Sequence, residues 1–326
     1  MEPEGGMLRI GTRGSRLALW QAEHVAARLR AAHPGLAVER VVISTTGDRV
    51  LNVALSQVGD KGLFTRELEE ALFAEGIDVA VHSLKDLPTE MPEGLALGAV
   101  LEREDPRDAL VGKASGGIGG LAHRARVGTS SLRRRAQLLA LRPDLQVVDL
   151  RGNVPTRLSK VERGDCDAAV LALAGLRRLG LEPAIGAVLD PDELMPAPGQ
   201  GAVAVQSRLA DARVAALLAS IDHGQTRIAV AAERGLLARL EGGCQVPVGA
   251  LATGVSGRLL LRGLVAEVDG SVVVRGVLED AAEDEASAKA LGERLADQLL
   301  GAGAREVLAR VRVAASEGTV PVWGGA

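Results

Sequence analysis

The chain has 326 residues, of which 47% are hydrophobic and 25% are charged, and its formal net charge is −4. A chain of this length is expected to form two or three domains rather than one core, and it has no apolar run near the ~20 residues that span a bilayer. Two cysteines are too few for a disulfide framework, and five scattered histidines show no metal-ligand spacing, so we expect no metal.

The N-terminal sequence MEPEGGMLRI carries acids where a secretory signal would be basic, so we expect a cytoplasmic protein that does not contact a membrane. Strand-like and helix-like segments then alternate over about 210 residues. Strands are predicted at residues 8–12, 37–44, 77–82, 95–101, 126–129, 146–150 and 168–173. Helices are predicted at residues 16–32, 63–74, 132–141 and 154–163, the first with Ser15 as its N-cap.

This alternation predicts an α/β fold with two similar lobes, mainly parallel sheets and helices on both sheet faces. We assign residues 1–101 and 202–219 to the first lobe and residues 102–201 to the second. The Pro/Gly-rich sequence MPAPGQG, residues 195–201, is the expected crossing between them. The pattern changes after a helix at about 222–240, with strands at 248–255, 258–267 and 271–278 and helices at 286–300 and 305–313. Residues 220–326 therefore predict a small α+β domain.

Cationic side chains concentrate in one central stretch, although the chain as a whole is acidic. Residues 124–178 contain twelve Lys or Arg against five Asp or Glu, a net charge of 12 − 5 = +7. Several of these arginines fall where a strand gives way to a helix, the usual place of a ligand crevice in an open α/β sheet. Because the guanidinium fork matches two oxygens at once, we expect a ligand rich in carboxylate or phosphate. Aromatic residues make up 1% of the chain, too few for base-stacking platforms, so we expect no nucleic-acid partner.

The sequence GTSSLRRR, residues 128–135, places a small-residue turn between a strand and a helix. Backbone N–H groups, hydroxyls and the helix dipole at such a turn attract an anion. Consecutive helical residues lie ~100° apart, so we predict that Arg133 and Arg134 face inward while Arg135 faces solvent or has a structural role. Taken alone, these residues fit a helix with a basic surface equally well.

A second cationic turn follows one βα unit later, in RGNVPTRL, residues 151–158. Arg151 ends the predicted strand, Asn153 can cap the next helix, and Arg157 lies in its first turn. The repetition of this design favours a ligand site. In AGLRRLG, one of Arg177 and Arg178 is expected to point inward.

In the first lobe, VHSLKDLP places Ser83, Lys85 and Asp86 just after a predicted strand. A lysine beside an aspartate is ordinarily a surface pair, but at this position the aspartate could stabilise a developing cation or transfer a proton. The turn GTRGS, with Arg13 and Ser15, is its expected partner.

Two loops of the sequence are candidates for functional roles. The sequence VGDKGLFTREL, residues 58–68, is either a mobile lid over the site or an ordinary loop. EGGCQVPVG, residues 241–249, places Cys244 after two glycines, an accessible position that suggests an attached group or a thiolate nucleophile. No His/Asn partner accompanies Cys244, which argues against a papain-like protease. Cys166, beside a predicted strand, fits a small buried hydrophobe.

Taken together, these motifs resemble the porphobilinogen deaminase (hydroxymethylbilane synthase) family. The resemblance runs in order over about residues 8–250 and continues more weakly to about residue 313. It rests on TRGSRLALWQ, KGLFTREL, DVAVHSLKDLP, EREDPRDAL, VGTSSLRRRAQL, LRGNVPTRLSK, AGLRRLGL, PAPGQGAVA and LEGGCQVPVGA.

The resemblance implies two lobes similar to periplasmic binding proteins and a third domain that carries the cofactor cysteine. It implies a dipyrromethane cofactor held by a thioether to Cys244. The implied transferase, a monomer of heme and tetrapyrrole biosynthesis, adds four porphobilinogen units head to tail with loss of ammonia and releases the linear tetrapyrrole hydroxymethylbilane. A growing chain of pyrrole rings would carry about a dozen negative charges, which suits a concentrated cluster of arginines.

Carried over position by position, the resemblance makes Asp86 the catalytic residue, whose carboxylate stabilises the cation formed as ammonia leaves and exchanges protons. Lys61 and Phe64 would belong to the possible lid. The residues implied to bind cofactor or substrate are Arg13, Ser15, Ser83, Lys85, Thr129, Ser131, Arg133, Arg134, Arg151, Arg157, Arg178 and Gln200.

One departure concerns the lid, where the neutral Gln57 stands at a position that is often lysine in the family. The alternative function is a non-catalytic anion-binding protein with the fold of a two-lobed solute receptor. The acidic N-terminus argues against an exported receptor.

Overall fold

The computed structural model describes residues 6–49, 64–112, 116–240, 246–255 and 258–316. The chain divides into two compact units. The first comprises the described parts of Met1–Leu51, Lys61–Glu104 and Gly201–Arg227, and the second comprises those of Asp105–Gln200 and Ile228–Ala326. Helix α8, Gly224–Arg239, crosses from one unit to the other.

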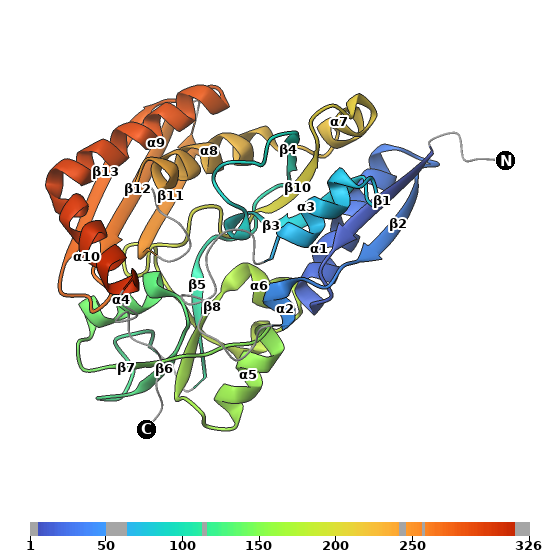
Figure 1. Ribbon diagram of the computed structural model, residues 1–326. Coiled ribbons are helices and arrows are strands. Elements are labelled where there is room, and N and C mark those ends of the chain that lie inside the picture. The colour runs from blue at the N-terminus through green and yellow to red at the C-terminus, as the bar shows by residue number, and fades with distance from the viewer. Residues whose placement is uncertain (1–5, 50–63, 113–115, 241–245, 256–257, 317–326) are drawn as a thin grey trace. The chain divides into compact units, whose positions relative to one another are not determined.

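The first unit is built on a five-stranded sheet with the order β2-β1-β3-β10-β4 (Figure 1). Strand β1 is parallel to β2 and β3, whereas β10 is antiparallel to β3 and β4. Residues of helices α1 and α7 pack against one sheet face, and residues of α3 pack against the other. The elements are β1 (Met7–Thr12), α1 (Arg16–Ala32), β2 (Ala37–Val42), α2 (Thr46–Arg49), α3 (Arg66–Phe73), β3 (Val79–Ser83), the 3-10 turn η2 (Leu84–Asp86), β4 (Leu95–Val100), β10 (Val203–Arg208) and α7 (Ala212–Ala219).

The second unit contains a sheet of the same design, with the order β7-β6-β8-β5-β9. Strand β6 is parallel to β7 and β8, and β5 is antiparallel to β8 and β9. Helix α4 contributes to the core on one face, and α5 and α6 contribute to the core on the other. The elements are β5 (Asp108–Gly112), β6 (Arg126–Gly128), α4 (Leu132–Leu141), β7 (Gln146–Val148), α5 (Val154–Glu162), β8 (Ala168–Ala172), α6 (Leu173–Arg178), η3 (Glu182–Ala184) and β9 (Ile185–Val188).

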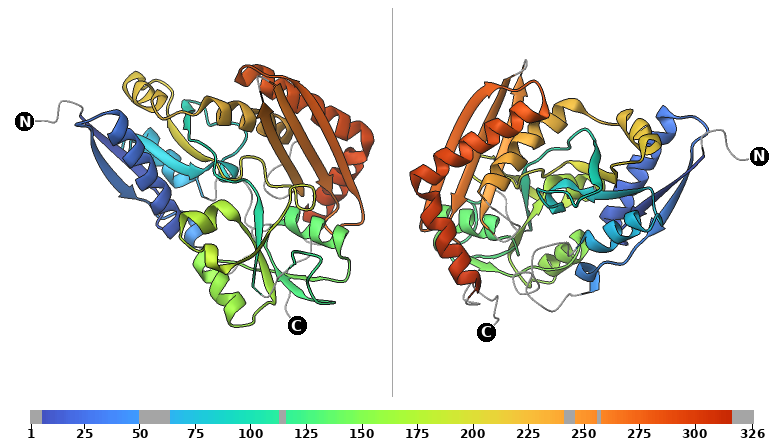
Figure 2. Two further views of the ribbon diagram at one scale, coloured as in Figure 1. Left: turned by 180° about the vertical axis from the view of Figure 1, so that it is seen from behind. Right: turned by 45° about the horizontal axis from the view of Figure 1, so that its top comes forward.

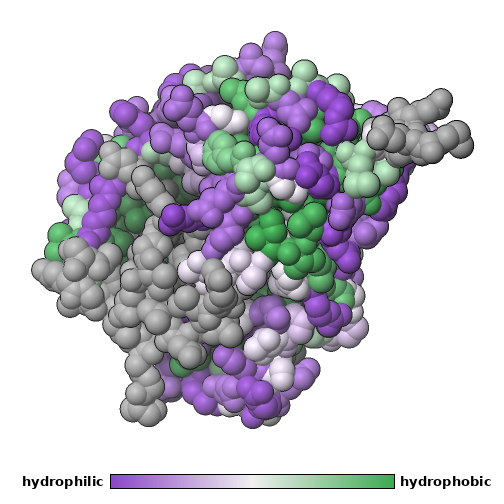
Figure 3. Space-filling model, turned by 45° about the vertical axis from the view of Figure 1, so that its right-hand side comes forward, coloured by the Kyte–Doolittle hydropathy of each residue, from purple (hydrophilic) through white to green (hydrophobic). Residues whose placement is uncertain are grey.

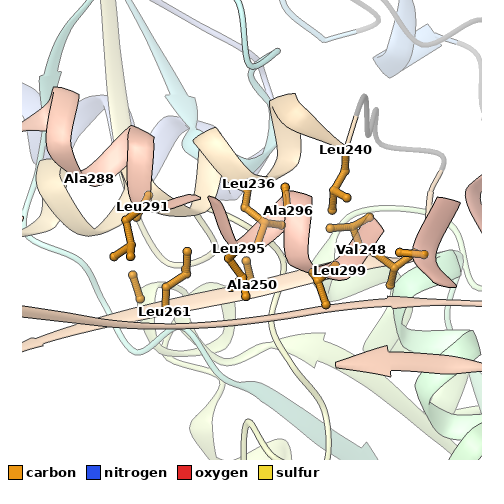
Figure 4. Close-up of a cluster of buried hydrophobic side chains, with 14 of the residues drawn as sticks. Leu236, Leu240, Val248, Ala250, Leu261, Ala288, Leu291, Leu295, Ala296 and Leu299 are labelled. Carbon is orange, nitrogen blue, oxygen red and sulfur yellow. The ribbon is translucent and has the colours of Figure 1, made fainter. Parts of the chain in front are cut away.

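The second unit also holds a three-stranded antiparallel sheet with the order β11-β12-β13. Figure 2 shows helices lying along this sheet, and Figure 4 shows the leucines through which they pack on it, among them Leu236, Leu261 and Leu295. Leu251 and Leu264 belong to a separate cluster with Ala136 of α4 and Met195. The elements are β11 (Val248–Val255), β12 (Arg258–Ala266), β13 (Val273–Ala281), α9 (Glu285–Leu299), the π-helical turn η4 (Leu300–Ala304) and α10 (Arg305–Ser316).

The predicted fold class is confirmed: two similar α/β sheets are followed by an α+β part. The sheets are mixed rather than mainly parallel, because β10 and β5 run against their neighbours. The domain boundaries that we assigned from the sequence stay a prediction.

The surface agrees with a chain that is one-quarter charged. Figure 3 shows a face on which hydrophilic side chains predominate, with apolar patches between them. In the described part of the chain, no helix combines the length and the apolarity needed to cross a membrane.

Helices α8 and α9 approach each other closely at Gly292, where an added Cβ would lie 2.1 Å from the carbonyl oxygen of Ala232. We predict that Gly292→Ala destabilises the protein by roughly 1–3 kcal/mol, because two backbones would have to move apart. The matched control is Gly301→Ala, where the added Cβ meets nothing within 4 Å. Thermal unfolding should show a lower midpoint for the first variant alone, and equal midpoints would contradict this account of the helix contact.

Candidate functional site

The first unit contains a pocket at the carboxyl ends of β1 and β3, with a cavity volume of about 70 Å³. Because these strands are parallel neighbours, their carboxyl ends meet at the same edge of the sheet. The structure therefore brings together residues that were predicted from separate motifs. The lining residues are Arg13, Ser15, Leu17, Ala18, Gln21, Phe64, Val81, His82, Ser83 and Asp86.

Asp86 is held on a short, well-anchored turn. The 3-10 turn Leu84–Asp86 follows β3 directly, and the buried side chains of Leu84 and Leu87 flank the exposed Asp86. The amide of Leu84 donates to the carbonyl of Ala202 at 3.0 Å, and the amide of Leu87 donates back to the Leu84 carbonyl. The carboxylate of Asp86 is thus presented to the pocket from a fixed backbone, while the neighbouring Lys85 is half-buried.

The start of helix α1 also lines the pocket. Ser15 caps the helix by accepting a hydrogen bond from the amide of Ala18 at 3.2 Å. The guanidinium carbon of Arg13 lies 4.1 Å from the centre of the Phe64 ring, a cation–π contact. Phe64 was assigned to the possible lid, and its ring covers Arg13. Lys61, the other lid residue, lies outside the described residues.

Gln21 is a pocket residue that the sequence analysis missed. It is 2% exposed and donates from Nε2 to the Ser83 hydroxyl at 2.9 Å, which fixes the orientation of that hydroxyl. A signal was present in the sequence. Gln21 interrupts the apolar face of α1 that Ala18, Ala22 and Val25 bury, and a buried amide needs a polar partner.

His82 is the second lining residue that the sequence analysis missed. Burial lowers the pKa of His82 to about 4, the charge of Arg13 lowers it further, and a hydrogen bond with Gln206 acts in the opposite direction. The imidazole is therefore neutral at physiological pH. Its Nε2 atom has no hydrogen-bond partner among the described residues.

In the second unit, the turn before α4 has the predicted form. Thr129 is buried, Ser131 caps α4 by accepting from the amide of Arg134 at 3.4 Å, and the amide of Ser131 donates to the Thr129 hydroxyl. Ser130, to which no role was assigned, donates to the carboxylate of Asp149.

Arg133 and Arg134 face inward as predicted, with exposures of 5% and 4%. Each forms an ion pair with Asp108, at 2.9 Å for Arg133 and 2.7 Å for Arg134. Gln200 lies beside them and donates from Nε2 to Asp108 at 2.8 Å and to the Pro106 carbonyl at 2.7 Å. The half-buried Arg135 donates to the Val147 carbonyl, a structural contact.

The second cationic turn has the predicted helix cap, but β7 ends at Val148 and Arg151 lies in the loop after it rather than at the end of the strand. Asn153 caps α5 by accepting from the amide of Thr156 at 3.0 Å, and Arg157 donates from Nε to the Gly152 carbonyl at 2.7 Å. Arg151 is ion-paired with Asp149 at 3.2 Å. Near the end of α6, Arg178 is half-buried, whereas Arg177 is exposed and lies 3.6 Å from Asp105. The ligand-binding roles of these residues stay predictions.

Cys166 is buried as expected, and Cys244 lies outside the described residues. Within the described ranges, no three His, Cys, Asp or Glu residues gather in a way that could hold a metal ion.

The lowered pKa of His82 predicts how stability depends on pH. The unfolded state binds a proton near the ordinary pKa of 6.5, whereas the folded state binds one only near 4. The free energy of unfolding should therefore fall as the pH drops from 6.5 to 4, by on the order of 3 kcal/mol. His82→Gln should reduce this dependence, and His123→Gln, at a side chain 79% exposed, should preserve it. Denaturant titrations across this range measure the effect, and identical profiles for wild type and His82→Gln would contradict it.

Two sequence-family models match the chain. One, described as porphobilinogen deaminase, dipyromethane cofactor binding domain, matches residues 8–216, and the porphobilinogen deaminase C-terminal domain matches residues 227–301.

Three solved structures illustrate more distant likenesses. The VFT2 domain of BvgS from Bordetella pertussis is 15% identical with a TM-score of 0.41, covering 66% of this chain and 86% of that chain. The regulatory domain of OxyR2 from Vibrio vulnificus is 15% identical with a TM-score of 0.43, and the match covers 68% of this chain and 97% of that chain. The methionine-binding protein MetQ is 15% identical with a TM-score of 0.43, and the match covers 67% of this chain and 89% of that chain.

Proposed function

The chain belongs to the porphobilinogen deaminase family, and we propose which of its residues carry out the reaction of that family. The enzyme is a transferase of tetrapyrrole biosynthesis that joins four porphobilinogen molecules head to tail, releases ammonia and forms hydroxymethylbilane with a dipyrromethane cofactor. A cytoplasmic monomer stays our prediction for its compartment and its assembly.

Asp86 is the catalytic residue in this proposal. The observation that carries the assignment is the pocket in which Asp86 lies with Arg13, Ser15 and Ser83. Loss of ammonia from the aminomethyl group of porphobilinogen leaves positive charge on the methylene carbon and the pyrrole ring. A carboxylate fixed beside that ring stabilises this charge, and it can pass a proton to the departing amine.

Each addition is balanced in atoms and charge. One C–N bond of porphobilinogen breaks and one C–C bond forms between pyrrole units, while the leaving amine gains the proton that the attacked ring position loses. Asp86 lines the described part of the pocket, and its carboxyl group can both give and take this proton. Arg13, 4.1 Å from the Phe64 ring, keeps positive charge at the pocket wall and is placed to bind a substrate carboxylate.

The described residues fit a group that carries several carboxylates. The turn Thr129–Ser131 offers hydroxyls and a helix N-terminus, and two buried arginines follow it. We propose that Cys244 holds the cofactor by a thioether, and that the bound cofactor supplies the end on which the product chain is built. The residues proposed to hold cofactor or substrate are Arg13, Ser15, Ser83, Lys85, Thr129, Ser131, Arg133, Arg134, Arg151, Arg157, Arg178 and Gln200.

Asp86→Asn should lower kcat by roughly 10²–10⁴-fold, because the amide neither neutralises the developing charge nor accepts a proton. The matched control is Glu90→Gln, which removes an exposed carboxylate four residues further along the chain. Steady-state assays with porphobilinogen measure the effect. Turnover of Asp86→Asn within about threefold of wild type would remove Asp86 from the catalytic role.

Intact-mass measurement tests the attachment site. The purified protein should be heavier than its sequence by one dipyrromethane group, and the excess should lie on the peptide that contains Cys244. Cys244→Ser should lose the added mass, whereas Cys166→Ser, at a buried cysteine, should keep it. An unmodified Cys244 in fully active protein would refute the attachment.

A further inference from the structure

Three residues predicted to bind ligand, taken from two separate motifs, converge on a carboxylate to which the sequence analysis gave no role. Arg133 donates to Asp108 Oδ2 at 2.9 Å, and Arg134 donates to Asp108 Oδ1 at 2.7 Å. Gln200 donates to Asp108 Oδ1 at 2.8 Å. Asp108 belongs to the motif EREDPRDAL and is fully buried at the first position of β5.

The two arginines are also fixed by backbone carbonyls. Arg133 donates to the carbonyl of Met195, and Arg134 donates to that of Val170 at 2.9 Å. Gln137 secures Met195 in turn, because its side chain accepts from the amide at 2.7 Å and donates to the carbonyl at 3.1 Å. The guanidinium groups are therefore held in one orientation before any ligand arrives, as preorganised recognition requires.

A contribution to the stability of the fold does not by itself explain why two arginines and an aspartate are buried together. Buried ion pairs stabilise a fold weakly compared with well-packed apolar residues, and here two guanidinium groups share one carboxylate. Burial lowers the pKa of Arg133, Asp108 opposes this effect, and the adjacent Arg134 adds to it. The three side chains together keep one net positive charge in a buried place.

One donor of the cluster still needs an acceptor. The Nε atom of Arg134 is buried and has no hydrogen-bond partner among the described residues. A buried N–H without an acceptor is costly, and a carboxylate beside it would satisfy both the hydrogen bond and the excess charge.

We propose that Asp108 is the positioning residue of the carboxylate-binding site, and that its buried side chain holds Arg133, Arg134 and Gln200 in the arrangement that receives a pyrrole carboxylate. This inference rests on the proposed function of the two arginines. Asp108 acts through them and does not itself touch the substrate.

Asp108→Asn tests the proposal with little change in shape. At a temperature at which the variant is folded, kcat/KM for porphobilinogen should fall by about 30-fold or more, mainly through KM. The matched control is Asp78→Asn, because Asp78 is also buried and pairs with Arg9 at 2.8 Å and Arg208 at 3.5 Å. Asp78 precedes β3, at the opposite end of that strand from the pocket residue Ser83. Both variants should lower the unfolding midpoint, but only Asp108→Asn should change KM.

Gln200→Met keeps the test decisive if Asp108→Asn does not fold. It removes the hydrogen bonds to Asp108 and to the Pro106 carbonyl without changing charge, so KM should rise by about threefold to tenfold. A wild-type KM in folded Asp108→Asn, or in Gln200→Met, would overturn the positioning role. Arg133→Leu is measured alongside, since a wild-type KM in that variant would instead overturn the proposed function of the arginines.

Discussion

The buried contact of Asp108 with two adjacent arginines is the interaction on which the second unit depends. Two like charges on neighbouring residues of a helix repel each other, and burial removes the water that would screen them. The carboxylate of Asp108 makes that burial possible, with Oδ1 facing Arg134 and Oδ2 facing Arg133. Without it, the two buried guanidinium groups would keep only backbone carbonyls as hydrogen-bond partners, and no charge would oppose theirs. The same contact leaves one positive charge in excess, which favours the binding of an anionic ligand there.

Several distant segments meet around this contact. The turn before α4 brings Ser131, the start of β5 brings Asp108, and residues 195–201 bring Met195 and Gln200. Glu233 of α8 ties the same segment to the three-stranded sheet, since its carboxylate accepts from the amides of Gly199 at 2.7 Å and Ala252 at 2.8 Å. Polar contacts of this kind specify one arrangement of the chain, because each leaves a buried group unsatisfied when it is broken.

The sequence predicted the elements with strong periodicity and missed those whose partners are remote. Helix α4 was predicted at its observed bounds, and the caps Ser15 and Asn153 were identified from local rules. Strands β5, β9 and β10 were missed, because each pairs with strands far away in sequence. Gln21, His82 and Asp108 were missed for a related reason. The role of a buried polar residue depends on its partners, and the partners of Asp108 lie 25 or more residues away.

The central claim is that the Asp108 cluster presents two fixed guanidinium groups to the carboxylates of a covalently held pyrrole chain. The most direct test is a crystal structure of the enzyme carrying its dipyrromethane cofactor. We expect a cofactor carboxylate within hydrogen-bond distance of Arg133 or Arg134, with Asp108 still paired to both arginines. Cofactor carboxylates bound entirely by other residues, with the cluster out of their reach, would contradict the account.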